Sequence, residues 1–199
     1  MKLSDFIAQF LYEQGVRHVF VVSGGAIIHS IDSVARHPGM DYVCVQHEQA
    51  AGAAADAYSR TGGKVGAAMV TSGPGATNLT TSICNAYFDS VPCLLICGQV
   101  TTPRLRPSSD LRQKGFQETD IVSLFFSITK YVRRVMDCHW PCIVHWSGND
   151  CLDVDLAQMY IDSVFKLHSN NVDEYVCSTF AQSTDDMAYV RCNMCMAAV

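Results

Sequence analysis

The sequence has no long apolar run, no excess of positive charge and no charged leader ahead of an apolar segment. No apolar stretch approaches the roughly 20 residues that a helix needs to cross a bilayer. The formal net charge of -5 argues against a basic surface that binds nucleic acid. The lack of a secretory leader predicts a cytoplasmic protein. We therefore expect neither a membrane nor a nucleic acid among its partners.

Charged residues are also scarce, at 17% of 199 residues against 49% hydrophobic ones. This balance is typical of a folded domain with a sizeable core and excludes a disordered chain. Cysteine, by contrast, is plentiful, with ten residues. Four of them lie in apolar stretches and are predicted to be small buried side chains, namely Cys44, Cys84, Cys93 and Cys97.

Two kinds of apolar segment alternate along residues 1–137. Short continuous apolar runs predict strands at 18–22, 42–45, 65–70, 92–97 and 130–135. Segments with helical spacing or composition predict helices near 3–11, 26–36, 48–59, 76–88 and 120–126. Because the strands are continuously apolar, the pattern predicts a mostly parallel sheet with helices on both faces, a three-layer α/β/α fold.

Glycine-rich or polar segments follow four of the predicted strands, at 23–25, 46–48, 72–78 and 98–99. The carboxyl ends of parallel strands meet at one edge of a sheet, where ligands bind. Glu48 begins an alanine-rich helix, and the simplest interpretation is an acid favoured by the helix dipole. The small residues that follow it allow a second helix to approach, which would place Glu48 at an interface.

The glycines beside Pro74 predict a tight turn whose backbone N–H groups are open to an acceptor. A plain strand-to-helix connection is the alternative. No Gly-Lys-Ser/Thr follows, which excludes a P-loop.

Four ordered motifs, at 46–60, 71–78, 98–100 and 115–120, together resemble the N-terminal pyrimidine-binding domain of thiamine diphosphate enzymes. The resemblance is to the acetolactate synthase branch and covers residues 1–137. It implies the thiamine diphosphate-binding fold. It also implies that the enzyme decarboxylates a 2-keto acid and joins the product to a second keto acid, with the cofactor as electron sink.

The resemblance implies that Glu48 is the catalytic residue, hydrogen-bonding the aminopyrimidine ring and promoting its imino tautomer. A carboxylate suits this task because it shares a proton with the ring nitrogen, whereas glutamine does not. The cofactor-binding residues implied are Gly24, Gly25, Ala26, Glu48, Pro74 and Asn78. On the substrate side it implies Phe116, Gln117 and, with a weaker match, Gln99. Position alone fits a second interpretation equally well, in which Phe116 is a core residue and Gln117 is a polar loop residue without a role in the site. Ser23 departs from the Tyr-Pro pair common in the branch, which leaves the acyl acceptor open.

Members of the family are longer than this chain. The resemblance implies a missing middle domain, often associated with FAD, and a missing domain that holds magnesium and the diphosphate through Gly-Asp-Gly. No Gly-Asp-Gly occurs here, and we assign no residue to a metal. The family's site forms between two subunits. We therefore expect half a site that needs a homodimer or a complementary diphosphate-binding domain and is inactive alone.

The composition changes abruptly after Asp137, and 138–199 is predicted to be an atypical tail. The family's last strand lies inside the sheet, so its loss predicts a gap, with 141–145 as a short substitute. A shifted reading frame, aberrant splicing or an incomplete gene model would explain the change. Two alternatives remain: a non-catalytic module that binds a protein partner, and a zinc site built from Cys138, Cys142, His145, Cys192 and Cys195.

Overall fold

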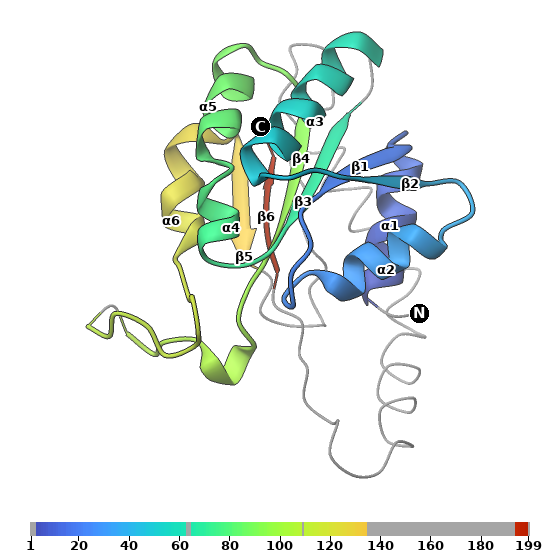
Figure 1. Ribbon diagram of the computed structural model, residues 1–199. Coiled ribbons are helices and arrows are strands. Elements are labelled where there is room, and N and C mark those ends of the chain that lie inside the picture. Colours follow the sequence, from blue (N-terminus) through green and yellow to red (C-terminus); the bar gives the residue numbers. More distant parts are fainter. Residues whose placement is uncertain (1–2, 63–64, 109, 135–193, 199) are drawn as a thin grey trace, which may run out of the picture.

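Helices and strands alternate along the chain in the computed structural model, which describes residues 3–62, 65–108, 110–134 and 194–198 (Figure 1). The α-helices are α1 Leu3–Glu13, α2 Ile28–Arg36, α3 Glu48–Gly62, α4 Pro74–Thr77, α5 Thr80–Phe88 and α6 Ile121–Phe125. The strands are β1 His18–Val21, β2 Asp41–Cys44, β3 Gly66–Val70, β4 Cys93–Gly98, β5 Tyr131–Arg134 and β6 Met194–Ala198. Two 3-10 turns, η1 Thr102–Arg104 and η2 Phe126–Ile128, complete the described elements.

The six described strands form one sheet in the order β2-β1-β3-β4-β6-β5. The pairs β1–β2, β1–β3 and β3–β4 are parallel, as the continuous apolar runs predicted. Strand β6 is antiparallel to both of its neighbours.

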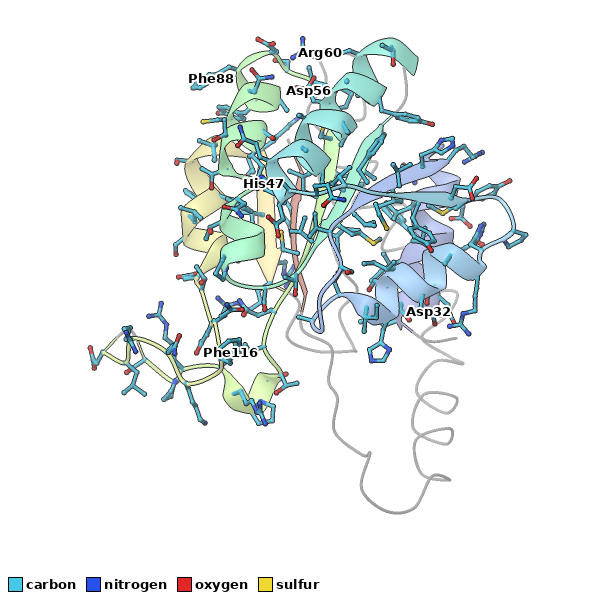
Figure 2. All side chains as sticks on the ribbon, viewed as in Figure 1. Asp32, His47, Asp56, Arg60, Phe88 and Phe116 are labelled. Carbon is cyan, nitrogen blue, oxygen red and sulfur yellow. The ribbon has the colours of Figure 1, made fainter. Side chains whose placement is uncertain are left out.

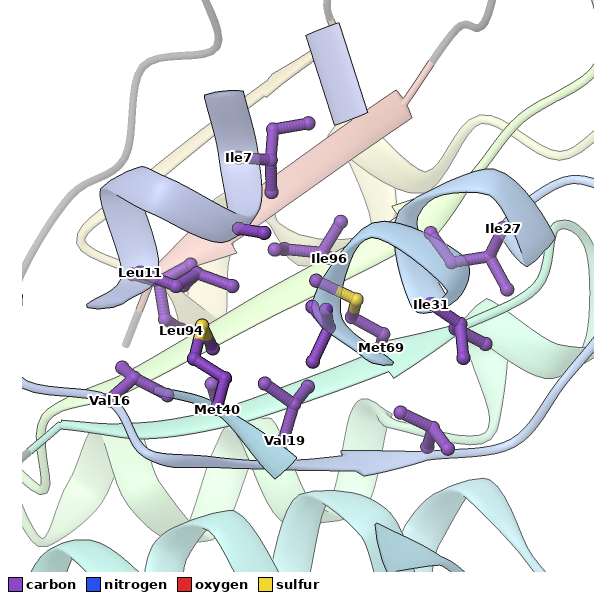
Figure 3. Packing of buried hydrophobic residues seen from close by; sticks show 14 of the residues in the cluster. Ile7, Leu11, Val16, Val19, Ile27, Ile31, Met40, Met69, Leu94 and Ile96 are labelled. Carbon is purple, nitrogen blue, oxygen red and sulfur yellow. The ribbon is translucent and has the colours of Figure 1, made fainter. Parts of the chain in front are cut away.

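Helices α1 and α2 cover one face of the sheet (Figure 3). Ile7 and Leu11 of α1 and Ile31 of α2 pack in one cluster with Met69 and Ile96 from the central strands. The apolar spacing predicted for α1 therefore faces the core, as an amphipathic surface helix requires.

Helices α3, α5 and α6 cover the other face. Ala55, Ile83 and Phe125, one from each helix, pack in a cluster with Ala68 and Leu95. Successive side chains of β3 and β4 enter opposite clusters, because strand side chains alternate in direction. The three-layer α/β/α fold predicted from the sequence is confirmed.

The predicted helix 76–88 is wrong in outline, because the structure divides it into α4 and α5. Helix α4 begins earlier, at Pro74, whose fixed φ suits the first helical position. The break falls at Asn78 and Leu79, where the N–H of Asn78, the residue after α4, bonds back to the carbonyls of Pro74 and Ala76.

Strand β6 fills the place where a gap was expected. It lies between β4 and β5, with Met196 opposite Ile96 on one side and Arg133 on the other. The prediction of an open gap is therefore wrong. The substitute strand proposed at 141–145 lies outside the described residues, as does the domain boundary at 137.

Strand β2 does not match the prediction that every strand is covered on both faces. All four of its residues are exposed, including Cys44, and Cys84 on α5 is only partly buried. The prediction of buried side chains is wrong for these two cysteines and confirmed for Cys93 and Cys97. Cys44 is exposed because it lies on β2, an edge strand with one neighbour in the sheet.

Within the described ranges, no helix has the length and apolar character needed to cross a membrane. The same ranges hold no group of three or more His, Cys, Asp or Glu side chains placed to bind a metal. The residues Cys138, Cys142, His145 and Cys192 of the zinc hypothesis lie outside them.

Candidate functional site

The predicted site residues lie in the connections that leave β1, β3 and β4 and at the start of α3. The loop after β1 lies against the end of β3, where a Cβ atom at Gly24 would overlap the Thr71 side chain. The same loop lies against the end of β4, since a Cβ atom at Gly98 would be 2.7 Å from the Cβ of Ala26. Gly25 is exposed and has no such neighbour within 4 Å. Three of the four strand ends predicted to converge, those of β1, β3 and β4, thus meet here.

The centre of the site is the pair Glu48 and Asn78. Asn78 Nδ2, at the end of α4, donates to Glu48 Oε2 over 2.8 Å. The second oxygen, Oε1, lies 3.3 Å from where a Cβ atom at Gly75 would be, and that position is also 2.8 Å from Thr71 Cγ2. Glycine at 75 therefore lets the α4 backbone approach both Glu48 and Thr71.

His47 precedes Glu48 but takes a local role (Figure 2). Its Nδ1 accepts a hydrogen bond from the Gln49 N–H over 3.1 Å. This bond satisfies one of the free N–H groups in the first turn of α3. The histidine therefore helps to begin the helix that carries Glu48.

Gln117 lies beside the glycine that precedes Pro74. A Cβ atom at Gly73 would overlap the Gln117 carbonyl oxygen, and both residues have left-handed backbones, with φ of 59° at Gly73 and 55° at Gln117. Such a conformation is uncommon for a residue other than glycine and is found at functional sites. Phe116 is 76% exposed, so the interpretation of Phe116 as a core residue is wrong (Figure 2).

Gln99 is placed differently from the other substrate-side candidates. It is 4% exposed, and its Nε2 donates to the Thr119 carbonyl over 2.9 Å while its Oε1 accepts from the Val100 N–H over 2.9 Å. Its amide therefore ties the end of β4 to the segment that carries Phe116 and Gln117.

The sequence did not single out two residues that support the site, Thr71 and Glu118. Thr71 contacts two of the glycine positions, and its place directly after β3 was the available signal. The Glu118 carboxylate accepts hydrogen bonds from the backbone N–H groups of Arg106, Lys114 and Gly115. No pattern in the sequence predicts that this carboxylate accepts from N–H groups both twelve residues earlier and three to four residues earlier.

The arrangement fits an aminopyrimidine ring. Glu48 is partly buried at the edge of the sheet, and Asn78 orients one of its oxygens. Among the described residues no hydrogen bond to Oε1 is found, so this oxygen can accept from a ring N–H. Glu48, Asn78 and the backbone around Gly75 would hold the ring.

Comparison with known proteins agrees with this chemistry. A family model described as "Thiamine pyrophosphate enzyme, N-terminal TPP binding domain" matches residues 1–124. The acetolactate synthase large subunit of Buchnera aphidicola subsp. Acyrthosiphon pisum (strain APS) is 41% identical over 128 residues, which cover 64% of this chain and 21% of that protein. The acetolactate synthase isozyme 3 large subunit of Escherichia coli (strain K12) matches with the same identity and coverage.

A plant protein gives a similar result. Acetolactate synthase 2, chloroplastic, of Zea mays is 43% identical over 136 residues, 68% of this chain and 20% of the plant protein. The chain thus spans about a fifth of the length of these curated relatives. Since the family model covers well over half of the 199 residues, the chain belongs to the thiamine pyrophosphate enzyme family and carries an acetolactate synthase-like N-terminal TPP-binding domain.

Proposed function

We propose that this domain binds the aminopyrimidine of thiamine diphosphate and supplies half of an acetolactate synthase-like active site. The reaction proposed is decarboxylation of a 2-keto acid followed by carboligation to a second keto acid. The observation that carries the proposal is the Glu48 carboxylate, which Asn78 holds by one oxygen beside Gly75 while the other oxygen faces no described donor.

The proposed roles of the protein's own groups follow from these contacts. Asn78 orients Glu48, and Glu48 Oε1 shares a proton with the pyrimidine ring nitrogen. Gly24, Gly25, Ala26 and Pro74 supply the backbone that approaches the cofactor. Phe116, which is exposed, and Gln117 face the substrate, while Gln99 supports their segment from within. When bound, the cofactor supplies the electron sink for decarboxylation.

The other half of the site must come from another domain. We propose that magnesium and the diphosphate are held by a diphosphate-binding domain, in a homodimer of a longer protein or in a separate complementary chain. We assign the FAD that the resemblance associates with this branch to the middle domain of that longer protein. The chain is proposed to be inactive alone, since it would supply only half of the site. A cytoplasmic location stays a prediction from the sequence.

The test is turnover of pyruvate after the full chain is mixed with the diphosphate-binding domain of a relative, thiamine diphosphate and magnesium. We expect Glu48→Gln to reduce acetolactate formation roughly 100-fold or more, because proton transfer by a positioned side chain contributes about that much. Glu13→Gln, on the exposed last turn of α1, is the matched control and should retain full activity. Unchanged turnover in Glu48→Gln would refute the role of Glu48, and turnover by the chain alone would refute the half-site.

A second candidate function is a non-catalytic module that binds a protein partner. The observation in its favour is Phe88 at the end of α5, which is 76% exposed and lies edge-on to Tyr87. Under this hypothesis the mixture above shows no turnover, and Phe88→Ser weakens partner binding instead. The zinc hypothesis for the tail is separate, and metal analysis of the purified chain decides it.

A further inference from the structure

The segment between β4 and α6 has few buried side chains. It extends away from the sheet in Figure 1, and among its described residues from 101 to 118 only Gly115 is buried. Hydrophobic burial therefore contributes little to its conformation. Polar contacts must keep it closed.

The Glu118 carboxylate provides such contacts. The Arg106 N–H donates to Oε1 over 2.7 Å, and the Lys114 and Gly115 N–H groups donate to Oε2 over 2.9 and 3.4 Å. Both carboxylate oxygens thus accept from the two ends of the stretch 106–115. Hydrogen bonds from backbone N–H groups to an ionised acceptor are stronger than those between neutral groups.

The charge state of Glu118 agrees with this role. Partial burial by itself raises the pKa of the carboxyl, but the hydrogen bonds from Arg106, Lys114 and Gly115, with the positive charge of the Arg106 side chain, outweigh burial and hold the pKa below its ordinary value of 4.5. Glu118 is therefore ionised at neutral pH, and both oxygens accept hydrogen bonds.

The closed loop ends at the substrate side of the proposed site. Glu118 directly follows Gln117, whose left-handed backbone lies against Gly73. On the other side of Glu118, the Thr119 carbonyl is bound by Gln99. Glu118 and Gln99 therefore fix both ends of a short segment whose backbone would otherwise relax from an uncommon conformation.

We propose that Glu118 is a positioning residue for the half-site: by accepting hydrogen bonds from the N–H groups of Arg106, Lys114 and Gly115, it holds Gln117 beside Gly73 and thereby positions the adjoining Phe116. The functional part of this inference rests on the function proposed above, whereas the closure of the loop does not.

Amide hydrogen exchange on the full chain tests the closure. Glu118→Gln keeps the size of the side chain but replaces one acceptor oxygen with an NH2 group, which cannot accept. We expect the amides of Arg106, Lys114 and Gly115 to exchange about tenfold faster or more, while those of β3 are unchanged. Asp110→Asn removes the same charge from the same loop and should change none of these rates, since within the described part of the chain its carboxylate accepts only a 3.5 Å bond from the Ser108 hydroxyl. Wild-type rates in Glu118→Gln would overturn the proposal.

Acid titration of the wild-type chain tests the same contact without a substitution. The pKa of Glu118 is lower in the folded loop than in the unfolded chain. The carboxylate therefore stabilises the closed loop fully at a pH above its ordinary pKa, and this stabilisation is lost as the pH falls through the lowered pKa of the folded loop. Protection of the three amides, corrected for intrinsic exchange, should disappear before that of β3. Protection that persists after Glu118 is protonated would contradict the proposal, even if Glu118→Gln fails to fold.

Kinetics of the complemented enzyme test the positioning. We expect Glu118→Gln to raise KM for the 2-keto acid about tenfold and to change kcat little, since the lost contact orients substrate-side groups and not Glu48. Asp110→Asn should match the wild type. A fall in kcat at constant KM would overturn the positioning role. No turnover by the wild-type mixture would count against the proposed function instead, and the exchange rates would still decide the role of Glu118 in the loop.

Discussion

Burial divides the cysteines of the described chain into two chemical classes. Cys93, at the start of β4, is buried, and its desolvation, with a smaller contribution from the charge of Asp56, raises its pKa to about 12. Cys44, on the edge strand β2, is exposed. Because the thiolate is the reactive form, residue type alone does not predict which cysteine reacts.

We therefore predict that iodoacetamide modifies Cys44 in the native chain at neutral pH while Cys93 and Cys97 stay unmodified until denaturant is added. Peptide mapping by mass spectrometry distinguishes these sites from the cysteines after Asp137. Labelling of the urea-unfolded chain, in which all sites should react, is the control. Equal native rates at Cys44 and Cys93 would mean that β4 is not in the core.

At the scale of elements, helices α3 and α5 approach each other closely because their contact residues are small. A Cβ atom at Gly52 would lie 2.6 Å from the Cβ of Ser82, and the Ser82 hydroxyl donates to the Gln49 carbonyl over 2.8 Å. Further along α3, the buried Asp56 accepts from Asn85 Nδ2 of α5 over 3.1 Å.

Arg60 extends the link between these two helices. Its guanidinium pairs with Asp56 on its own helix (Figure 2). Its Nη2 donates to Asp89 Oδ2, just beyond α5, over 2.5 Å. The small residues of α3 thus allow it to pack closely against α5 of the same domain, with Gly52 at the contact. Since α3 begins with Glu48, the packing of α3 against α5 also fixes the position of the proposed catalytic residue.

We predict that Gly52→Ala lowers the free energy of unfolding by about 1–3 kcal/mol, because the added methyl group overpacks the contact with Ser82. Gly62→Ala, in the same helix, meets no atom of the described residues within 4 Å and should change stability little or raise it by up to about 1 kcal/mol. Urea unfolding followed by circular dichroism measures both. Equal effects of the two substitutions would show that α3 and α5 are further apart than described.

For the whole molecule, the sheet depends on a strand that comes from the far end of the chain. Strand β6 joins β5, and with it α6, to the four parallel strands. Without β6, the described strand β5 has no neighbour in the sheet, and the backbone groups of β4 on that side lose their partners. Unpaired backbone groups at such an edge cost free energy and invite association.

We predict that Met196→Pro destabilises the fold by about 1–3 kcal/mol, because proline cannot donate to the ladder of a strand that is paired on both sides and leaves the carbonyl it faced without a donor. Met196→Ala keeps the N–H and is the control for the lost side chain. Thermal unfolding and amide exchange in β4 report the effect. If the two variants behave alike, the pairing of β6 with β4 contributes nothing to stability.

Local sequence patterns were sufficient to predict the layers, most strand and helix positions and the edge of the sheet where the site lies. Helical and strand spacing and the sharp turn at Pro74 act over a few residues, so they can be read without knowing the rest of the fold. The resemblance to thiamine diphosphate enzymes, carried by the motifs around Glu48 and Pro74, is confirmed by the family comparison. The individual site residues stay predictions, which the contact between Glu48 and Asn78 supports.

Only the tertiary structure decided the features that depend on groups far apart in sequence. The exposure of Cys44 follows from the place of β2 at the sheet edge, and the sheet is completed by β6 pairing with β4, nearly a hundred residues earlier. The buried amide of Gln99 and the three bonds to Glu118 likewise need a folded loop before either side chain has its partners. The sequence by itself thus determined the fold class, the family and the candidate acid, because these rest on local spacing and motifs. The tertiary structure decided burial, strand order and the support of the site, because these rest on which distant backbone groups come into contact.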